Sequence, residues 1–108
     1  MSQHDLILVY LRKYKGITSM EAFNRLGITQ LATRIKELKE RGYQFGEVWE
    51  ENDNRFGVPC RYKRYFLVGR RKDYDENDLL EMDKDIFLAS FDVAEEEYEM
   101  LQKDMQEM

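Results

Sequence analysis

The sequence has little of what disulfides, metal sites and cysteine-based catalysis require. Its 108 residues include one cysteine, Cys60, and one histidine, His4. A single cysteine excludes an intrachain disulfide, and a structural zinc site or a Cys-His catalytic pair would need partners that the chain mostly lacks. Cys60 follows Pro59 and is more typical of an inert turn residue than of a nucleophile.

Long apolar runs are also missing. No stretch reaches the roughly 20 apolar residues that a membrane-spanning helix needs. Near the start only Leu6–Leu11 is continuously apolar, which is too short for a secretion signal with its cleavage site. There is no phosphate-binding loop, metal-ligand cluster or Ser-His-Asp set. We therefore expect a cytoplasmic protein that is not an enzyme, uses no cofactor or metal and does not enter a membrane.

Charge, in contrast, is abundant and unevenly divided. Residues 1–72 contain 15 Lys and Arg against 8 Asp and Glu, a balance of +7, whereas residues 73–108 contain 2 against 14, a balance of −12. Such asymmetry suggests a nucleic-acid partner for the basic part. We expect a basic domain over residues 1–72, with a core supplied by the 43% of hydrophobic residues, and an acidic extension over residues 73–108.

The central stretch, residues 17–43, has the pattern of two short helices joined by a tight turn. An apolar helix over residues 4–14 is expected before it. Ser19 is the expected N-cap of the first short helix, and Gly27 breaks that helix where a left-handed residue is needed. The second helix, expected over residues 29–41, carries an apolar stripe of Leu31, Ile35 and Leu38. This is the helix-turn-helix arrangement, whose second helix can enter a DNA major groove.

The outward face of that second helix is polar. Base contacts in this motif come from the N-terminal part of the recognition helix. Gln can bond adenine, Thr can touch a thymine methyl group, and Arg can bind guanine or phosphate. The helix residues expected to contact DNA are Thr29, Gln30, Thr33, Arg34 and Lys36. An ordinary helical hairpin with a solvated polar face is the alternative.

Beyond Gly42 the pattern becomes that of strands. Extended segments from Tyr43 to about Glu51 and over residues 61–68 flank a stretch rich in turn residues. Two such strands beside a recognition helix make a wing, here residues 52–68. Basic side chains on a wing contact phosphate or a minor groove, and those expected to do so are Arg55, Arg61, Lys63 and Arg64, trailed by Arg70, Arg71 and Lys72. A solvated basic hairpin without a partner is the alternative.

Together these segments resemble the small helix-turn-helix domain found in phage and prophage proteins. The resemblance covers roughly residues 6–68 and is carried by Leu26-Gly27, Leu31-Ala32-Thr33-Arg34-Ile35, Leu38-Lys39-Glu40-Arg41-Gly42 and Asn54-Arg55-Phe56-Gly57. It implies a winged-helix fold, association with DNA and, for a phage-encoded protein, the host cytoplasm. The acidic extension departs from the pattern of that family. The expected fold class is α+β: three helices plus a two-stranded wing, followed by one or two acidic helices.

The acidic extension keeps helical spacing, which a disordered tail would not be expected to do. Leu79, Met82 and Ile86 fall on one helical face. Asp92 is the expected N-cap of a last helix, with Glu95 completing a capping box. An apolar stripe follows at Ala94, Tyr98, Leu101, Met105 and Met108. We expect ordered helices that pack on the winged helix or on a second copy of the chain.

Three functions fit this organisation. The leading one is a phage-type, sequence-specific double-stranded DNA-binding protein that regulates transcription or assists replication, dimerised through residues 93–108. A second is an anti-defence inhibitor, similar to anti-CRISPR proteins, whose acidic helices mimic nucleic acid or bind a host defence protein. In a third, the acidic segment covers the basic surface of its own chain until it is displaced.

Overall fold

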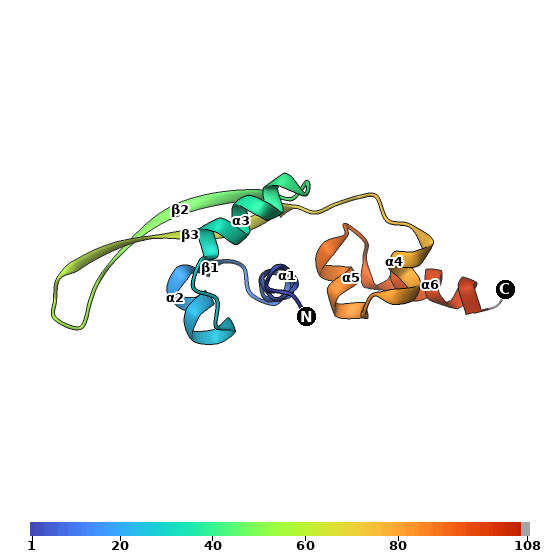
Figure 1. The fold of residues 1–108 in the computed structure, drawn as a ribbon, viewed down its shortest axis with the longest axis horizontal. Coiled ribbons are helices and arrows are strands. Elements are labelled where there is room, and N and C mark those ends of the chain that lie inside the picture. Colours follow the sequence, from blue (N-terminus) through green and yellow to red (C-terminus); the bar gives the residue numbers. More distant parts are fainter. Residues whose placement is uncertain (107–108) are drawn as a thin grey trace.

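The computed structural model describes residues 1–106, and its elements follow the expected order (Figure 1). In chain order the elements are α1 (Gln3–Lys13), β1 (Ile17–Thr18), α2 (Ser19–Glu21), the π-helix η1 (Ala22–Leu26), α3 (Leu31–Glu40), β2 (Gln44–Asp53), β3 (Pro59–Gly69), α4 (Glu76–Glu81), α5 (Lys84–Ser90) and α6 (Glu95–Gln106). The expected α+β class, a winged helix-turn-helix followed by C-terminal helices, is confirmed. Within residues 1–106 the C-terminal helices number three rather than one or two.

The helix-turn-helix begins one residue earlier than expected, because Thr18 and not Ser19 caps α2. The Thr18 hydroxyl accepts a hydrogen bond from the backbone N–H of Glu21 at 3.2 Å, and the Glu21 carboxylate accepts one from the Thr18 N–H at 3.0 Å. This reciprocal pair is a capping box. The expectation for Gly27 is confirmed, since it ends η1 with a φ of 70° in the left-handed region.

The recognition helix α3 begins at Leu31, two residues later than expected. Gln30 has φ −126° and ψ 61°, outside the helical region, and its carbonyl accepts the first helical hydrogen bond from Arg34 at 3.2 Å. Thr29 and Gln30 therefore precede α3 instead of forming its first turn. The expected apolar stripe is confirmed, because Leu31, Ile35 and Leu38 are all buried.

The sheet has the order β1-β3-β2 with antiparallel pairing throughout. Alternate residues of a strand face opposite sides. Tyr65 of β3 lies in the main core with Ile17, Leu31 and Ile35, whereas its neighbour Arg64 points to the other side of the sheet. Beyond the short β1, strands β2 and β3 continue as a long hairpin that projects away from the helices (Figure 1). The wing therefore spans residues 44–69 and is longer than the expected 52–68.

The wing and the C-terminal helices make the molecule elongated, with extents of 62 × 22 × 21 Å. Its Cα radius of gyration is 16.4 Å, whereas a compact domain of this length would have about 13 Å. Figure 1 places the wing tip at one end and α6 at the other. The helix-turn-helix lies between them, with the wing on one side and the C-terminal helices on the other.

The three C-terminal helices pack against one another, and α5 also packs onto α1. Phe87 is fully buried in a second apolar cluster with Tyr98, while Ala89 of α5 belongs to the main core. Leu101 and Met105 pack against the same second cluster, and Ala94 is exposed. Dimerisation through these residues stays a prediction, as does the division into domains 1–72 and 73–108. Met108 lies outside the described residues.

The last helix begins later than Asp92 suggests. The carbonyl of Ala94 accepts a hydrogen bond from the backbone N–H of Tyr98 at 3.0 Å, which makes Ala94 the N-cap of α6. Asp92 is used differently: its backbone N–H donates to the carbonyl of Arg71 at 2.8 Å. The chain after α5 is thereby joined to the segment that follows β3, and this pairing replaces the expected capping box.

Candidate nucleic-acid interface

The outward face of α3 is formed by residues opposite the buried stripe. Thr33 and Lys36 are exposed there, and Thr29 and Gln30 are exposed just before the helix. Lys36 makes no ion pair with any residue that the structure describes. These side chains are therefore exposed to solvent, and their contact with DNA stays a prediction.

Arg34 lies elsewhere on the helix. It is half-buried, and its Nε atom is 3.0 Å from Oε1 of Glu37, although the geometry does not make a hydrogen bond. The same Glu37 oxygen lies 3.2 Å from Nε2 of His4 on α1. Arg34 is thus held on the side of α3 that faces α1, and a base contact would require it to leave Glu37.

On the wing, Trp49 stands between two of the basic residues that the sequence indicated. Pairing of β2 with β3 places Trp49 opposite Lys63. Arg61 is two residues before Lys63 on β3, so both side chains lie on the same face of the hairpin. The Arg61 guanidinium carbon and the Lys63 Nζ each lie 5.0 Å from the indole centroid. This is cation–π distance. With 58% of Trp49 exposed, the three side chains form an amphipathic cationic surface on the wing.

A chain of charges connects this surface to the recognition helix. Oxygens of Glu47 on β2 lie 3.4 Å from Nζ of Lys39 on α3 and 3.4 Å from Nζ of Lys63 on β3. Partial desolvation opposes ionisation of Glu47, but the two ammonium groups outweigh it and hold the pKa of this carboxyl below its usual value. Helix and wing therefore present lysines on one continuous side, with Glu47 between them.

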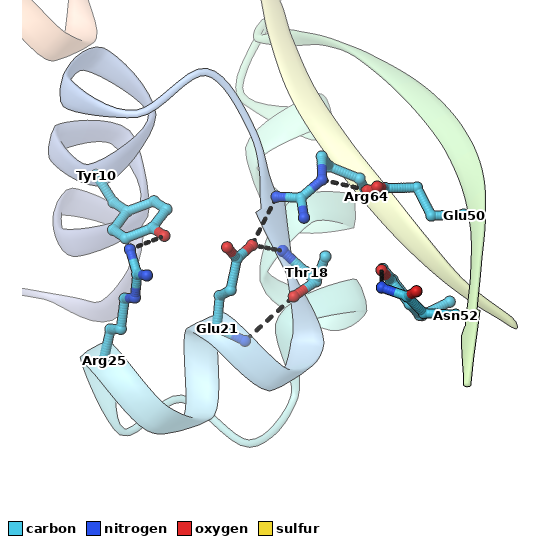
Figure 2. Close-up of polar contacts among 8 residues, drawn as sticks. Tyr10, Thr18, Glu21, Arg25, Glu50, Asn52 and Arg64 are labelled. Carbon is cyan, nitrogen blue, oxygen red and sulfur yellow. Dashed lines mark hydrogen bonds and ion pairs between the residues drawn. The ribbon is translucent and has the colours of Figure 1, made fainter. Parts of the chain in front are cut away.

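Arg64 belongs to a different network on the opposite face of the wing (Figure 2). Its Nη1 atom donates to Oε1 of Glu21 at 2.7 Å, and its Nε atom donates to Glu50. The bond to Glu50 contributes most to raising the pKa of Arg64, partial burial opposes it, and Glu21 adds to it. Because both carboxylates are within the chain, Arg64 joins α2, β2 and β3, and we leave it out of the proposed interface.

The wing tip is an ordered turn that displays Arg55 and Phe56. The side-chain oxygen of Asn54 accepts hydrogen bonds from the backbone N–H groups of Phe56 and Val58 at 2.9 and 3.0 Å, and Gly57 has a φ of 75°. The backbone N–H of Asn54 donates to the carbonyl of Val58 at 2.8 Å and closes a three-residue loop over residues 55–57. Such a loop needs a left-handed residue at its last position, which glycine supplies. The Arg55 guanidinium lies 5.5 Å from the Phe56 ring, and Phe56 is 79% exposed. The tip is therefore an ordered, exposed pair of one cation and one aromatic ring.

Sequence reasoning missed Trp49, Phe56 and Lys39 as parts of this surface. Trp49 lies in the segment that the sequence predicts to be extended, and Phe56 lies in the Asn54-Arg55-Phe56-Gly57 motif. The two-residue alternation of strands could have placed Trp49 beside Arg61 and Lys63 once the register was known. The register itself depends on tertiary packing.

No helix within residues 1–106 is both long and apolar enough to cross a membrane. The described part of the chain also contains no cluster of three His, Cys, Asp or Glu side chains suited to a metal ion. Residues 2–70 match a family model described as "Winged helix-turn-helix domain". No curated protein and no solved structure matches the chain.

Proposed function

Because the chain belongs to the winged helix-turn-helix family, we propose that it is a sequence-specific double-stranded DNA-binding regulator. In this proposal α3 enters the major groove, where Gln30 and Thr33 meet base edges and Lys36 meets phosphate. Membership of the family supports a DNA-binding role. Sequence specificity is the finer part of the proposal.

The observation that carries the proposal is the continuous side formed by α3 and the wing. Lys36 is unpaired there among residues 1–106, Arg61 and Lys63 flank the exposed Trp49, and Lys39 and Lys63 share a single carboxylate. A DNA duplex lying along α3 would meet these cations beside its groove. Phosphate contacts of this kind supply affinity without sequence preference, whereas the N-terminal end of α3 supplies discrimination.

We further propose that the protein is phage-type and acts in transcription or as a replication accessory, as the resemblance of its motifs implies. The role as an inhibitor of a host defence protein stays a prediction, and the acidic surface of the C-terminal helices alone does not favour it over DNA binding. Homodimerisation remains a further prediction. Of its four proposed contact residues only Ala94 is exposed, since Tyr98 is buried and Leu101 and Met105 are half-buried.

The test is selection of duplexes from a randomised library by the full chain, followed by affinity measurements on the selected sequence. Thr33→Ala should bind the selected duplex about 5- to 150-fold more weakly and tolerate changes at one base pair, because removing a base contact costs about 1–3 kcal/mol. Lys103→Ala, on the exposed side of α6, is the matched control. Failure to enrich any duplex would contradict sequence-specific binding.

A further inference from the structure

Four cations gather where α3 ends and where β3 leads into the C-terminal helices. Arg70, Arg71 and Lys72 directly follow β3, and Arg41 directly follows α3. They line an open cavity of about 410 Å³ together with Gly42, Gln44 and Asp73. We call these four residues the junction cluster. It lies at the opposite end of α3 from the helix-turn-helix turn.

The junction cluster has no carboxylate partner within 4.0 Å among residues 1–106. Several cations elsewhere are paired: Arg34, Lys39, Lys63, Arg64 and Lys84 each lie within ion-pair distance of a glutamate. Asp73 lines the cavity, and two further carboxylates, Asp5 and Asp78, line a smaller neighbouring cavity that Arg41 and Arg71 also line. None of these three carboxylates forms an ion pair with the cluster among residues 1–106. In addition, the Nε atom of Arg70 is buried and has no hydrogen-bond partner. A buried donor of this kind is costly unless an acceptor forms a hydrogen bond with it.

The cluster is held in place by the surrounding backbone. The N–H of Arg71 donates to the carbonyl of Ser90 at 3.3 Å, and its own carbonyl accepts from Asp92 at 2.8 Å. Its guanidinium lies 5.5 Å from the Phe91 ring. The N–H of Arg41 closes the last turn of α3 on the carbonyl of Leu38 at 3.0 Å. Arg41 alone is accounted for by the preference of helix C-termini for cations, but Arg70, Arg71 and Lys72 lie outside any helix.

We propose that the junction cluster binds a phosphate group. Three arginines and one lysine line a shared cavity. The planar fork of arginine matches the oxygens of phosphate in a bidentate manner. The phosphate belongs either to the backbone of a DNA duplex or to a free phosphate-bearing compound. Binding of a DNA phosphate rests on the proposed function, because DNA lying along α3 would bring a phosphate beyond the C-terminal end of this helix. Binding of a free phosphate compound does not depend on the proposed function.

The test uses the full chain and two double variants with the same change in charge. Arg70→Gln/Lys72→Gln leaves Arg71 packed on Phe91, and Lys13→Gln/Lys103→Gln is the control on exposed positions of α1 and α6. Inorganic phosphate is titrated at constant ionic strength while the amide NMR signals of Gly42 and Arg71 are followed. We expect the parent and the control to show the same saturable shifts, and the cluster variant to bind phosphate at least tenfold more weakly. In a second titration with a duplex, the slope of log affinity against log salt should flatten by about 0.9 for each phosphate that the cluster variant no longer binds.

Each combination of results decides the proposal. Loss of phosphate binding without a change of the duplex slope assigns the site to a free phosphate compound. A flattened slope without binding of inorganic phosphate assigns the site to the duplex backbone. If the cluster variant loses phosphate binding and also flattens the slope, the site accepts the phosphate of either source. If the parent shows no phosphate-dependent shift and the cluster variant matches the control on DNA, the proposal is overturned. A chain that binds phosphate but no duplex would contradict the proposed function and leave this site standing.

Discussion

The Nη1 atom of Arg64 lies 2.7 Å from Oε1 of Glu21, which ties the wing to the first helix of the helix-turn-helix. The same Glu21 oxygen accepts the N–H of Thr18, so one carboxylate both caps α2 and holds β3 (Figure 2). The residues are 43 positions apart in the sequence. Their contact joins the wing to α2, the first helix of the helix-turn-helix.

Arg64 should therefore matter for stability more than for DNA contact. Arg64→Met is expected to lower the free energy of unfolding by about 1–2 kcal/mol, because charge-assisted hydrogen bonds are removed at a site that is only partly shielded from water. Urea denaturation measures this loss. The slope of log DNA affinity against log salt should stay that of the parent. A slope flattened by about 0.9 would instead make Arg64 a phosphate contact.

Glu47 should weaken DNA binding in the parent, because it places a negative charge between Lys39 and Lys63. Glu47→Gln is expected to bind all duplexes several-fold more tightly and to steepen the salt dependence. Glu81→Gln, an exposed acid on α4, removes the same charge and serves as the control. Equal effects of the two variants on affinity and salt slope would show that only net charge matters.

The same carboxyl predicts a pH dependence. Since the pKa of Glu47 is lowered in the folded chain, its ionised form contributes stability above the usual value of 4.5, and this contribution is lost as the pH falls through the lower folded value. Unfolding of the parent and of Glu47→Gln should therefore differ more at pH 6 than at the acid end of the titration. A difference that grows on acidification would contradict the cause that we assign.

The apolar stripe of α6 should stabilise the chain internally. Tyr98 is buried, and its ring centroid lies 5.1 Å from that of Phe87. Tyr98→Ala is expected to lower the free energy of unfolding by about 2–4 kcal/mol, because it leaves a cavity in the second apolar cluster. Sedimentation of the variant and the parent should give the same mass. A dimer in the parent that becomes monomeric in Tyr98→Ala would instead favour pairing between two copies.

The order of elements could be predicted from the sequence because it depends on local signals. A few neighbouring residues suffice to show the helical spacing of Leu31, Ile35 and Leu38. The same is true of Gly27, a residue that can adopt the left-handed conformation at the end of a helix. The capping box of Thr18 and Glu21 is also visible in the sequence as a Thr-x-x-Glu pattern. The prediction of Ser19 as the N-cap did not take this pattern into account. Asp92 shows the converse, since its capping pattern lost to a pairing with Arg71 that no local signal indicates.

The residues of the candidate site were less predictable, because the sequence does not show which of several possible partners a charged side chain contacts. Lys63 and Arg64 are adjacent and both basic, yet only the face of the strand decides that one lies beside Trp49 and the other meets Glu21. Arg34 is likewise turned towards Glu37, which also contacts His4. Which face of the wing covers the core is decided by tertiary packing. That packing places Lys63 on the proposed interface and directs Arg34 and Arg64 to glutamates of the same chain.

The proposed function depends above all on whether the outward face of α3 discriminates between DNA sequences, and Gln30 and Thr33 test this most directly. Fluorescence anisotropy should compare the parent, Gln30→Ala/Thr33→Ala and Lys103→Ala on the selected duplex and on a scrambled duplex of equal length. We predict that the double variant loses at least tenfold in affinity for the selected duplex but not for the scrambled one, while Lys103→Ala keeps the discrimination of the parent. If the double variant still prefers the selected duplex as strongly as the parent does, α3 does not read DNA sequence and the proposed function is contradicted.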